Sequence, residues 1–191
     1  MPYEQGVIMK YALILIDIQN DYFTGGKMEL FGMDKAANNA KNLLDTFRKA
    51  KLPIFHVQHI SNRAGATFFL PDTEGVKIHE SVAPLPNETV VQKNFPNSFR
   101  NTSLLNHLND ANIEEVVICG AMSHMCVDAT TRAAFDLGYN CVVIEDACAT
   151  RNLQHKDKVI KAENVHAAFM AALAVLYAKV ISLNDFEITV V

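Results

Sequence analysis

Three residues that can perform nucleophilic chemistry stand at comparable places in the chain. Asp17 and Lys93 each end a short apolar run, and Cys126 follows another such run after a short turn. A thiolate is an effective nucleophile, a neighbouring ammonium lowers the pKa of a thiol, and a carboxylate can take the proton. We therefore expect these residues to form one catalytic group, with Cys126 as the nucleophile.

Each residue alone has a simpler structural interpretation. Asp17 would be a cap or turn residue, Lys93 a solvated side chain and Cys126 a small buried hydrophobe. The three together favour catalysis. Because a low-pKa thiol also oxidises readily, a redox-sensing or binding protein is the alternative from another class.

The segment from Gly120 to Cys126 adds a second component that a cysteine enzyme needs. Ser123 is the expected N-cap of a helix over residues 123–137, which places Cys126 in its first turn. Unpaired backbone N–H groups and the helix dipole stabilise a thiolate there, and such groups can also hold the oxyanion of a tetrahedral intermediate. The turn therefore favours acyl transfer through Cys126.

Short apolar runs alternate along the chain with longer amphipathic segments. This alternation predicts an α/β fold, a three-layer α/β/α arrangement around a six-stranded, mainly parallel, Rossmann-like sheet. The expected strands are 12–17, 54–57, 90–93, 116–119, 141–144 and 179–182, and the expected helices are 34–51, 102–110, 123–137 and 155–178. Sites form at the carboxyl ends of such strands, where the three residues would meet.

We interpret residues 1–191 as a single domain in which one segment breaks the alternation. Residues 61–88 lack a clear period and contain two glycines, three prolines and the aromatic pair Phe68 and Phe69. A loop of this length is commonly functional. We expect a lid or an interface arm.

Composition limits the function classes. The 191 residues include 17 Lys and Arg against 21 Asp and Glu, a net charge of −4 that excludes a strongly basic nucleic-acid binder. The longest apolar stretch, 167–178, is shorter than the roughly 18 residues that suggest a membrane span. The first nine residues show no secretion signal, and the four cysteines lack paired CxxC spacing, so reduced thiols and a cytoplasmic location are expected.

Four segments together resemble the isochorismatase-like cysteine hydrolases, which include nicotinamidases, N-carbamoylsarcosine amidohydrolases, biuret hydrolases and isochorismatases. The segments are 15–23 (LIDIQNDYF), 91–99 (VQKNFPNSF), 117–127 (VICGAMSHMCV) and 138–147 (GYNCVVIEDA). Each is weak alone, but their order and separations are highly specific. The resemblance implies a six-stranded, mainly parallel sheet, a catalytic triad of Asp17, Lys93 and Cys126, and a homodimer or homotetramer.

The resemblance also implies a special turn before the cysteine. A cis peptide bond would join Ala121 to Met122 and direct the N–H of Met122, with that of Cys126, at the oxyanion. A threonine is more usual at the place of Ser123, and this change keeps the hydroxyl group.

The chain departs from nicotinamidases in the segment that binds metal. Those enzymes carry an Asp-x-His pair and a further histidine after the second strand, whereas His56 and His59 here lie in HVQH without an acid. We expect no metal, no other cofactor and a small-molecule substrate other than nicotinamide. Cys126 favours cleavage of an amide-like C–N bond through a thioester. Vinyl-ether hydrolysis of the isochorismatase type, which needs acid catalysis more than a nucleophile, is the alternative.

Residues near the triad are candidates for substrate binding. Gln19 and Phe23 follow the acid, and His124 precedes the cysteine by two positions. Turn hydrogen bonding is an equal alternative for Gln19. His166, beside the apolar face of the last expected helix, is expected to be a hydrogen-bonded core histidine.

Overall fold

The computed structural model describes residues 10–187, so the expected lack of a secretion signal in residues 1–9 lies outside the described part. Six strands form one sheet, in which every neighbouring pair is parallel. The strand order is β3-β2-β1-β4-β5-β8. These strands are β1 (Tyr11–Ile16), β2 (Ile54–His59), β3 (Thr89–Lys93), β4 (Glu115–Ala121), β5 (Asn140–Ala149) and β8 (Lys179–Ile181).

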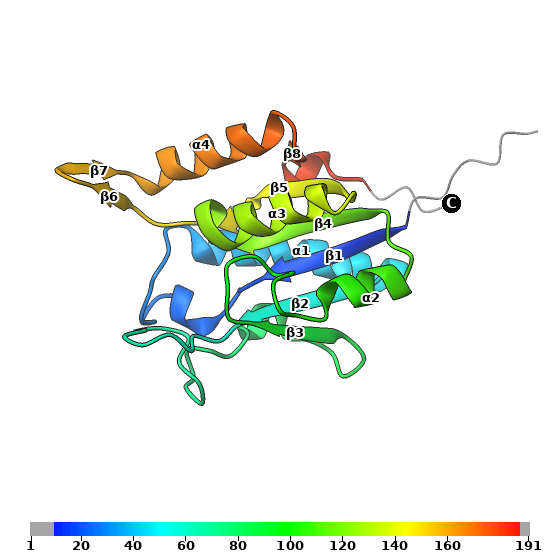
Figure 1. Cartoon of the computed structure of the whole chain (residues 1–191), viewed down its shortest axis with the longest axis horizontal. Helices are drawn as coiled ribbons and strands as arrows, with labels where there is room; N and C mark the ends of the chain where they lie inside the picture. Colours follow the sequence, from blue (N-terminus) through cyan, green and yellow to red (C-terminus); the bar gives the residue numbers. More distant parts are fainter. Residues whose placement is uncertain (1–9, 188–191) are drawn as a thin grey trace, which may run out of the picture.

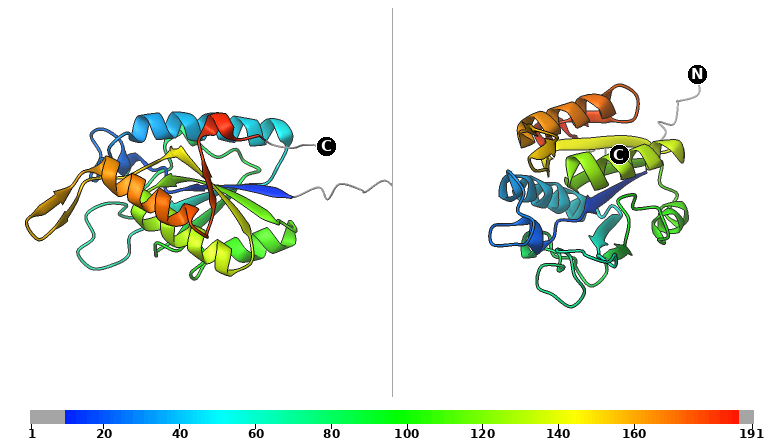
Figure 2. Two further views of the ribbon diagram at one scale, coloured as in Figure 1. Left: turned by 90° about the horizontal axis from the view of Figure 1, so that it is seen from above. Right: turned by 60° about the vertical axis from the view of Figure 1, so that its left-hand side comes forward.

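Helices cover both faces of the sheet, as the alternation of the sequence predicts (Figures 1 and 2). On one face, α1 (Met33–Ala50) packs on β1 residues such as Leu13 and Leu15. On the other, Ile14 and Ile16 meet side chains of α2 (Leu104–Asp110), α3 (Asp128–Asp136) and α4 (Ala162–Ala174). Because successive strand residues point to opposite faces, this continuous apolar strand is buried on both sides.

The expected helix over 155–178 is wrong in its first part. A hairpin of β6 (Leu153–His155) and β7 (Lys158–Ile160) comes first and extends away from the body of the molecule (Figure 1). The helix begins later because the side-chain oxygen of Asn152 accepts a hydrogen bond from the first helical N–H, that of Ala162, at 2.8 Å. Val159 matches the helical period of the residues that follow, yet it lies exposed on the hairpin.

The expected single helix over 123–137 is divided. A π-helical turn, Ser123–Val127, precedes α3. Ser123 is not the N-cap, since its buried hydroxyl donates to the carbonyl of Ala149 at 3.2 Å. Short 3₁₀ turns complete the secondary structure at Asn20–Tyr22, Glu80–Val82 and Leu183–Asp185. Within residues 10–187, no helix combines the length and apolarity that a membrane crossing requires.

Candidate active site

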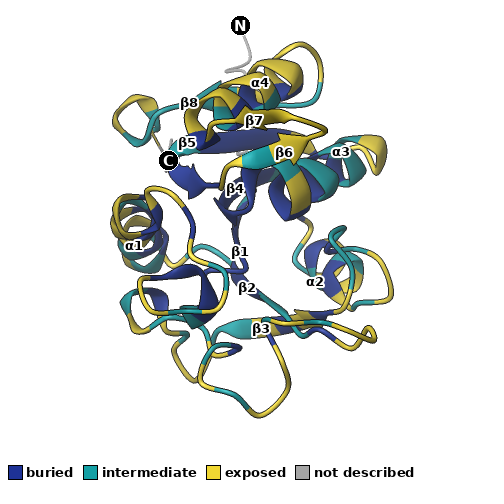
Figure 3. Cartoon of the chain, turned by 90° about the vertical axis from the view of Figure 1, so that its left-hand side faces the viewer, coloured by how far each residue is buried: buried dark blue, intermediate teal, exposed yellow. Residues whose placement is uncertain are grey.

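Asp17, Lys93 and Cys126 meet at the carboxyl edge of the sheet, which faces the viewer in Figure 3. Lys93 Nζ donates to Asp17 Oδ2 at 2.7 Å, and both side chains are fully buried. A ligand-type oxygen of Asp17 lies within 4.8 Å of Cys126 Sγ. The structure therefore brings together the three residues that the sequence singled out.

Each of these residues is positioned by the end of a strand. Asp17 leaves β1 with a positive φ of 51°, while its N–H still donates to Val57 of β2 at 3.0 Å. Lys93 is the last residue of β3, where the strand pattern turns its side chain inward. Cys126 lies in the π-helical turn that follows β4 and is 5% exposed. The central strand β1 and the edge strand β3 thus bring the charged pair together in the interior.

The expectation that the pKa of the Cys126 thiol is lowered is wrong. Burial raises the pKa of the Cys126 thiol well above its usual range, and the Asp17 carboxylate raises it further, while Lys93 opposes both. Burial acts to lower the pKa of Lys93, but Asp17 and Cys126 outweigh it, so the pKa is raised. The raised pKa values leave Lys93 as an ammonium and Cys126 as a protonated thiol.

One oxygen of Asp17 is available for the thiol proton. Oδ2 accepts the Lys93 bond, whereas Oδ1 is buried and has no hydrogen-bond partner among residues 10–187. A buried carboxylate oxygen without a donor is unusual, because desolvation is then uncompensated. A carboxylate with an unused acceptor, and with one oxygen within 4.8 Å of Cys126 Sγ, has the arrangement of a base beside its proton donor.

The turn before Cys126 has the backbone that the resemblance implies. The peptide bond between Ala121 and Met122 is cis. Gly120 has a φ of 121°, and a Cβ atom there would collide with the carbonyl oxygen of Ile16, so only glycine fits between β4 and β1. His166 Nδ1 lies 2.9 Å from the Ser123 hydroxyl, which shows the half-buried histidine hydrogen-bonded as expected.

The three expected substrate-binding residues lie in different settings. The Gln19 amide is fully buried, with Nε2 donating to the carbonyls of His59 and Val76 and Oε1 accepting from the His59 N–H. Phe23 is buried and stacks on His79 with a centroid distance of 3.6 Å. His124 is half-buried, with Nδ1 2.6 Å from Thr150 Oγ1. The Gln19 amide therefore binds backbone groups far away in the sequence, which differs from the turn hydrogen bonding that was its alternative.

His59 is a site residue that the sequence prediction missed. It is the register partner of Lys93 across β2 and β3, and its Nδ1 lies 3.1 Å from Lys93 Nζ. The predicted strand ended at Val57, but β2 continues to His59. The available signal was the alternation itself, because His59 follows Val57 by two positions as Lys93 follows Val91.

The neighbouring His56 belongs to a different group. Its Nε2 lies 2.9 Å from Glu88 Oε2, and Glu88 also binds Arg48 through Nε at 2.7 Å. We call Arg48, His56 and Glu88 the Glu88 network. His56 and His59 therefore have separate partners.

The side chains of the site that could act as metal ligands do not suit a metal ion. Among the described residues, Asp17, His59 and Cys126 form the group whose ligand atoms lie within 4.8 Å of one another. The Lys93 ammonium stands between them, 2.7 Å from Asp17 and 3.1 Å from His59. A divalent cation would have to displace a buried positive charge, so these residues do not fit a resident metal.

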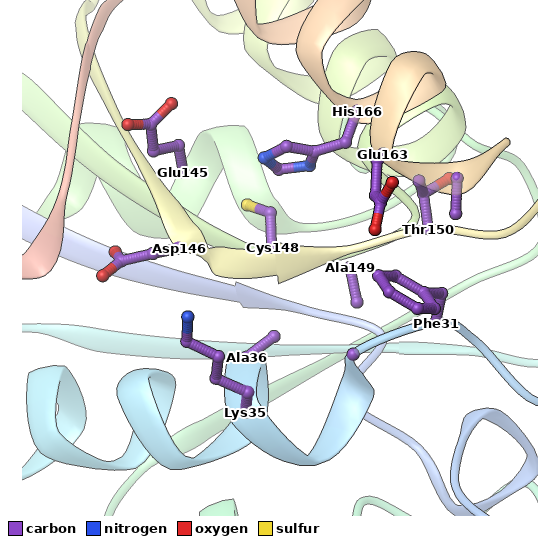
Figure 4. A pocket seen from close by; sticks show the side chains of 12 residues that line it. Phe31, Lys35, Ala36, Glu145, Asp146, Cys148, Ala149, Thr150, Glu163 and His166 are labelled. Carbon is purple, nitrogen blue, oxygen red and sulfur yellow. The ribbon is translucent and has the colours of Figure 1, made fainter.

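A separate cavity of about 410 Å³ lies between the start of α1, the end of β5 and α4 (Figure 4). Phe31 and Glu163 stand at its walls, and Cys148 and His166 line it from β5 and α4. Burial raises the pKa of the Cys148 thiol to about 12, so this second cysteine is an inert one. The cavity contains none of Asp17, Lys93 or Cys126.

Comparisons with known proteins identify a family and similar structures. A family model, the isochorismatase domain, matches residues 11–185. The uncharacterized isochorismatase family protein YddQ of Bacillus subtilis (strain 168) is 56% identical over 93% of this chain and 99% of YddQ. Ureidoacrylate amidohydrolase RutB of Cronobacter sakazakii is 29% identical over 71% of this chain and 73% of RutB. The crystal structure of an isochorismatase from Pseudomonas putida KT2440 superposes with a TM-score of 0.87, at 39% identity over 93% of this chain and 90% of that chain.

Proposed function

The chain belongs to the isochorismatase-like cysteine hydrolases, and from this premise we propose that it hydrolyses an amide-like C–N bond of a small molecule without a cofactor. The observation that carries the proposal is the buried Lys93–Asp17 pair beside Cys126, with Asp17 Oδ1 free to accept a proton. RutB, a relative, is an amidohydrolase, which supports the same bond class.

The first half of the reaction forms a thioester. Asp17 accepts the Cys126 proton as the sulfur attacks the carbonyl carbon, so thiolate develops only as the new bond forms. The π electrons of the carbonyl move onto its oxygen, which the N–H groups of Met122 and Cys126 stabilise. Asp17 then gives the proton to the leaving nitrogen, and the C–N bond breaks.

The second half restores the enzyme. Asp17 takes a proton from water, and the resulting hydroxide attacks the thioester carbon. The C–S bond breaks, the carboxylic product leaves, and the sulfur regains the proton from Asp17. Throughout, the Lys93 ammonium holds Asp17 in place and compensates the negative charge on sulfur.

Access to the sulfur involves the segment 61–88, which we propose as the lid. Phe69 in this segment is buried, its N–H donates to Asp21 Oδ2 at 2.6 Å, and its ring lies 6.0 Å from that of His59. Since Cys126 is only 5% exposed, the substrate enters when this segment moves. A nucleophilic thiol must stay reduced, which fits a reducing compartment such as the cytoplasm.

The test is ammonia release from a panel of amides, ureas and carbamoyl compounds. We expect turnover by the wild type and a loss of at least about 1000-fold in Cys126→Ala and Cys126→Ser. Cys141→Ala is the matched control, because Cys141 lies at the opposite end of β5 from the site. Wild-type rates in either Cys126 variant would end the assignment, and a vinyl ether cleaved by Cys126→Ala would favour the isochorismatase-type alternative.

A further inference from the structure

His59 is placed to act on the triad without belonging to it. Its Nδ1 lies 3.1 Å from Lys93 Nζ, which is also bonded to Asp17 at 2.7 Å. One of its ring nitrogens lies within 4.8 Å of Cys126 Sγ and of an Asp17 oxygen. Lys93 therefore has two polar partners on its buried ammonium, one charged and one an imidazole.

The backbone around His59 fixes this placement. Gln19 holds the peptide groups of His59 on both sides, since its Oε1 accepts from the His59 N–H at 2.7 Å and its Nε2 donates to the His59 carbonyl at 2.9 Å. The next N–H, that of Ile60, donates to the Lys93 carbonyl at 2.9 Å. A fully buried glutamine used in this way serves to orient the histidine.

We propose that His59 is a positioning residue, whose neutral imidazole accepts a hydrogen bond from Lys93 through Nδ1 and fixes the ammonium beside Cys126. This inference rests on the proposed function, because it assigns the role of Lys93 in that reaction. An ammonium with two acceptors at fixed places keeps its third N–H directed along one line. Loss of the imidazole acceptor leaves Asp17 alone to orient Lys93.

The acceptor role requires a neutral ring. Burial lowers the pKa of His59, and Asp17, which follows β1, opposes this. Lys93 on β3 and Arg63 in the segment 61–88 lower the pKa further. Cys126, on the turn after β4, is a further titratable group beside it. His59 is thus neutral at pH 7. A protonated His59 ring has no acceptor for the Lys93 ammonium and repels it. The hydrogen bond between the two side chains is therefore lost as the pH falls below the ordinary histidine range.

Two variants separate the acceptor from the bulk of the ring. His59→Asn keeps an oxygen acceptor near the place of Nδ1 and cannot titrate, whereas His59→Phe keeps the ring size and removes the acceptor. For His59→Phe we expect a decrease in kcat of about 10- to 100-fold with little change in KM. His59→Asn should retain kcat within about threefold. In the wild type, protonation of His59 lowers the rate at acidic pH, and His59→Asn should lose this part of the pH dependence.

A second readout needs no substrate. The rate of Cys126 alkylation by iodoacetamide, followed by mass spectrometry of the labelled peptide, reports how well Lys93 stabilises the thiolate. At a fixed pH near 8, His59→Phe should label about tenfold more slowly than the wild type, and His59→Asn should label nearly as fast. His155→Asn, on the exposed hairpin, is the control for the loss of a histidine.

The outcomes distinguish this inference from the proposed function. Unchanged labelling, kcat and pH profile in a folded His59→Phe would overturn the positioning role, even if turnover depends on Cys126. Absence of Cys126-dependent turnover would instead overturn the function, while the labelling rates still test His59. If circular dichroism shows that His59→Phe does not fold, the pH profile of His59→Asn decides. If the histidine were merely structural, this variant would lose activity at acidic pH just as the wild type does.

Discussion

At the scale of single residues, the buried Lys93–Asp17 pair links catalysis to stability. Both side chains are fully buried and bonded to each other at 2.7 Å. Asp17→Asn should reduce kcat by at least about 1000-fold, because the base is lost. It should also lower the free energy of unfolding by about 3–5 kcal/mol, because a buried ammonium loses its counter-charge. Urea unfolding and kinetics measure the two effects.

The double variant Asp17→Asn with Lys93→Met is the control for this prediction. Removing both charges should recover much of the lost stability and none of the activity. A single Asp17→Asn variant as stable as the wild type would show that the pair is not buried as described.

The thiol itself gives a second prediction. Because burial and Asp17 raise the pKa of Cys126, its alkylation rate in the free enzyme should keep rising beyond pH 9. Circular dichroism at each pH checks that the protein remains folded. A plateau already at pH 7 would mean a preformed thiolate and would contradict the protonated resting state.

How much of the site the sequence predicts depends on the kind of property. Strand ends and spacing indicated Asp17, Lys93 and Cys126, and the structure brings them together, while their catalytic roles stay predictions. The direction of the thiol pKa shift was wrong because desolvation depends on the whole fold, which local sequence does not show. Gln19 was singled out, but its binding to the backbone of His59 joins positions 40 residues apart.

At the scale of elements, the Glu88 network ties the start of β3 to α1 and β2. Burial acts to raise the pKa of Glu88, but bonds from Arg48, the Leu85 N–H and His56 outweigh it and lower the pKa to about 2. A lowered folded pKa means stabilisation that is present above the unfolded value, near 4.5, and lost as the pH falls toward 2.

Glu88→Gln should therefore lower the free energy of unfolding at pH 7 by about 2 kcal/mol. The difference from the wild type should shrink between pH 4.5 and 2, measured by urea unfolding at several pH values. Glu74→Gln, from an exposed pair with Lys77, should have little effect at any pH. A difference for Glu88→Gln that does not change with pH would refute the electrostatic explanation.

Element types were more predictable than their ends. The six strands were expected because their apolar runs are short and bounded, and all six are present with shifted limits. The hairpin before α4 was missed because Val159 fits a helical period, and the choice between the two structures depends on Asn152, ten residues before the helix start. His59 was missed for a similar reason, since the end of β2 is set by its pairing with β3.

At the scale of the whole molecule, exposed apolar side chains lie on both sides of α4 along the chain. Val175 is 84% exposed and Leu176 62% exposed, and Val159 lies exposed on the projecting hairpin. We expect these surfaces to be covered by a second copy of the chain, in keeping with the dimer or tetramer that the family resemblance implies.

Light scattering of the purified protein tests this expectation. The wild type should have the mass of a dimer or tetramer, and Val175→Glu combined with Leu176→Lys should shift it toward the monomer. Leu85→Lys, which changes an exposed leucine in the segment 61–88, is the control and should leave the mass unchanged. A monomeric wild type would exclude the interface.

The register of β3 on β2 also bears on how such a protein can acquire new substrates. A slip of one residue would turn Lys93 to the opposite face, away from Asp17 and His59. Arg48 and His56 hold Glu88 just before this strand, so the register is fixed independently of the residues between Ser61 and Val82. Grafting a loop of different length or composition into the part of that interval before Val76, whose carbonyl holds Gln19, should therefore change selectivity while the reactive centre keeps its alignment, which makes it the natural place for directed evolution.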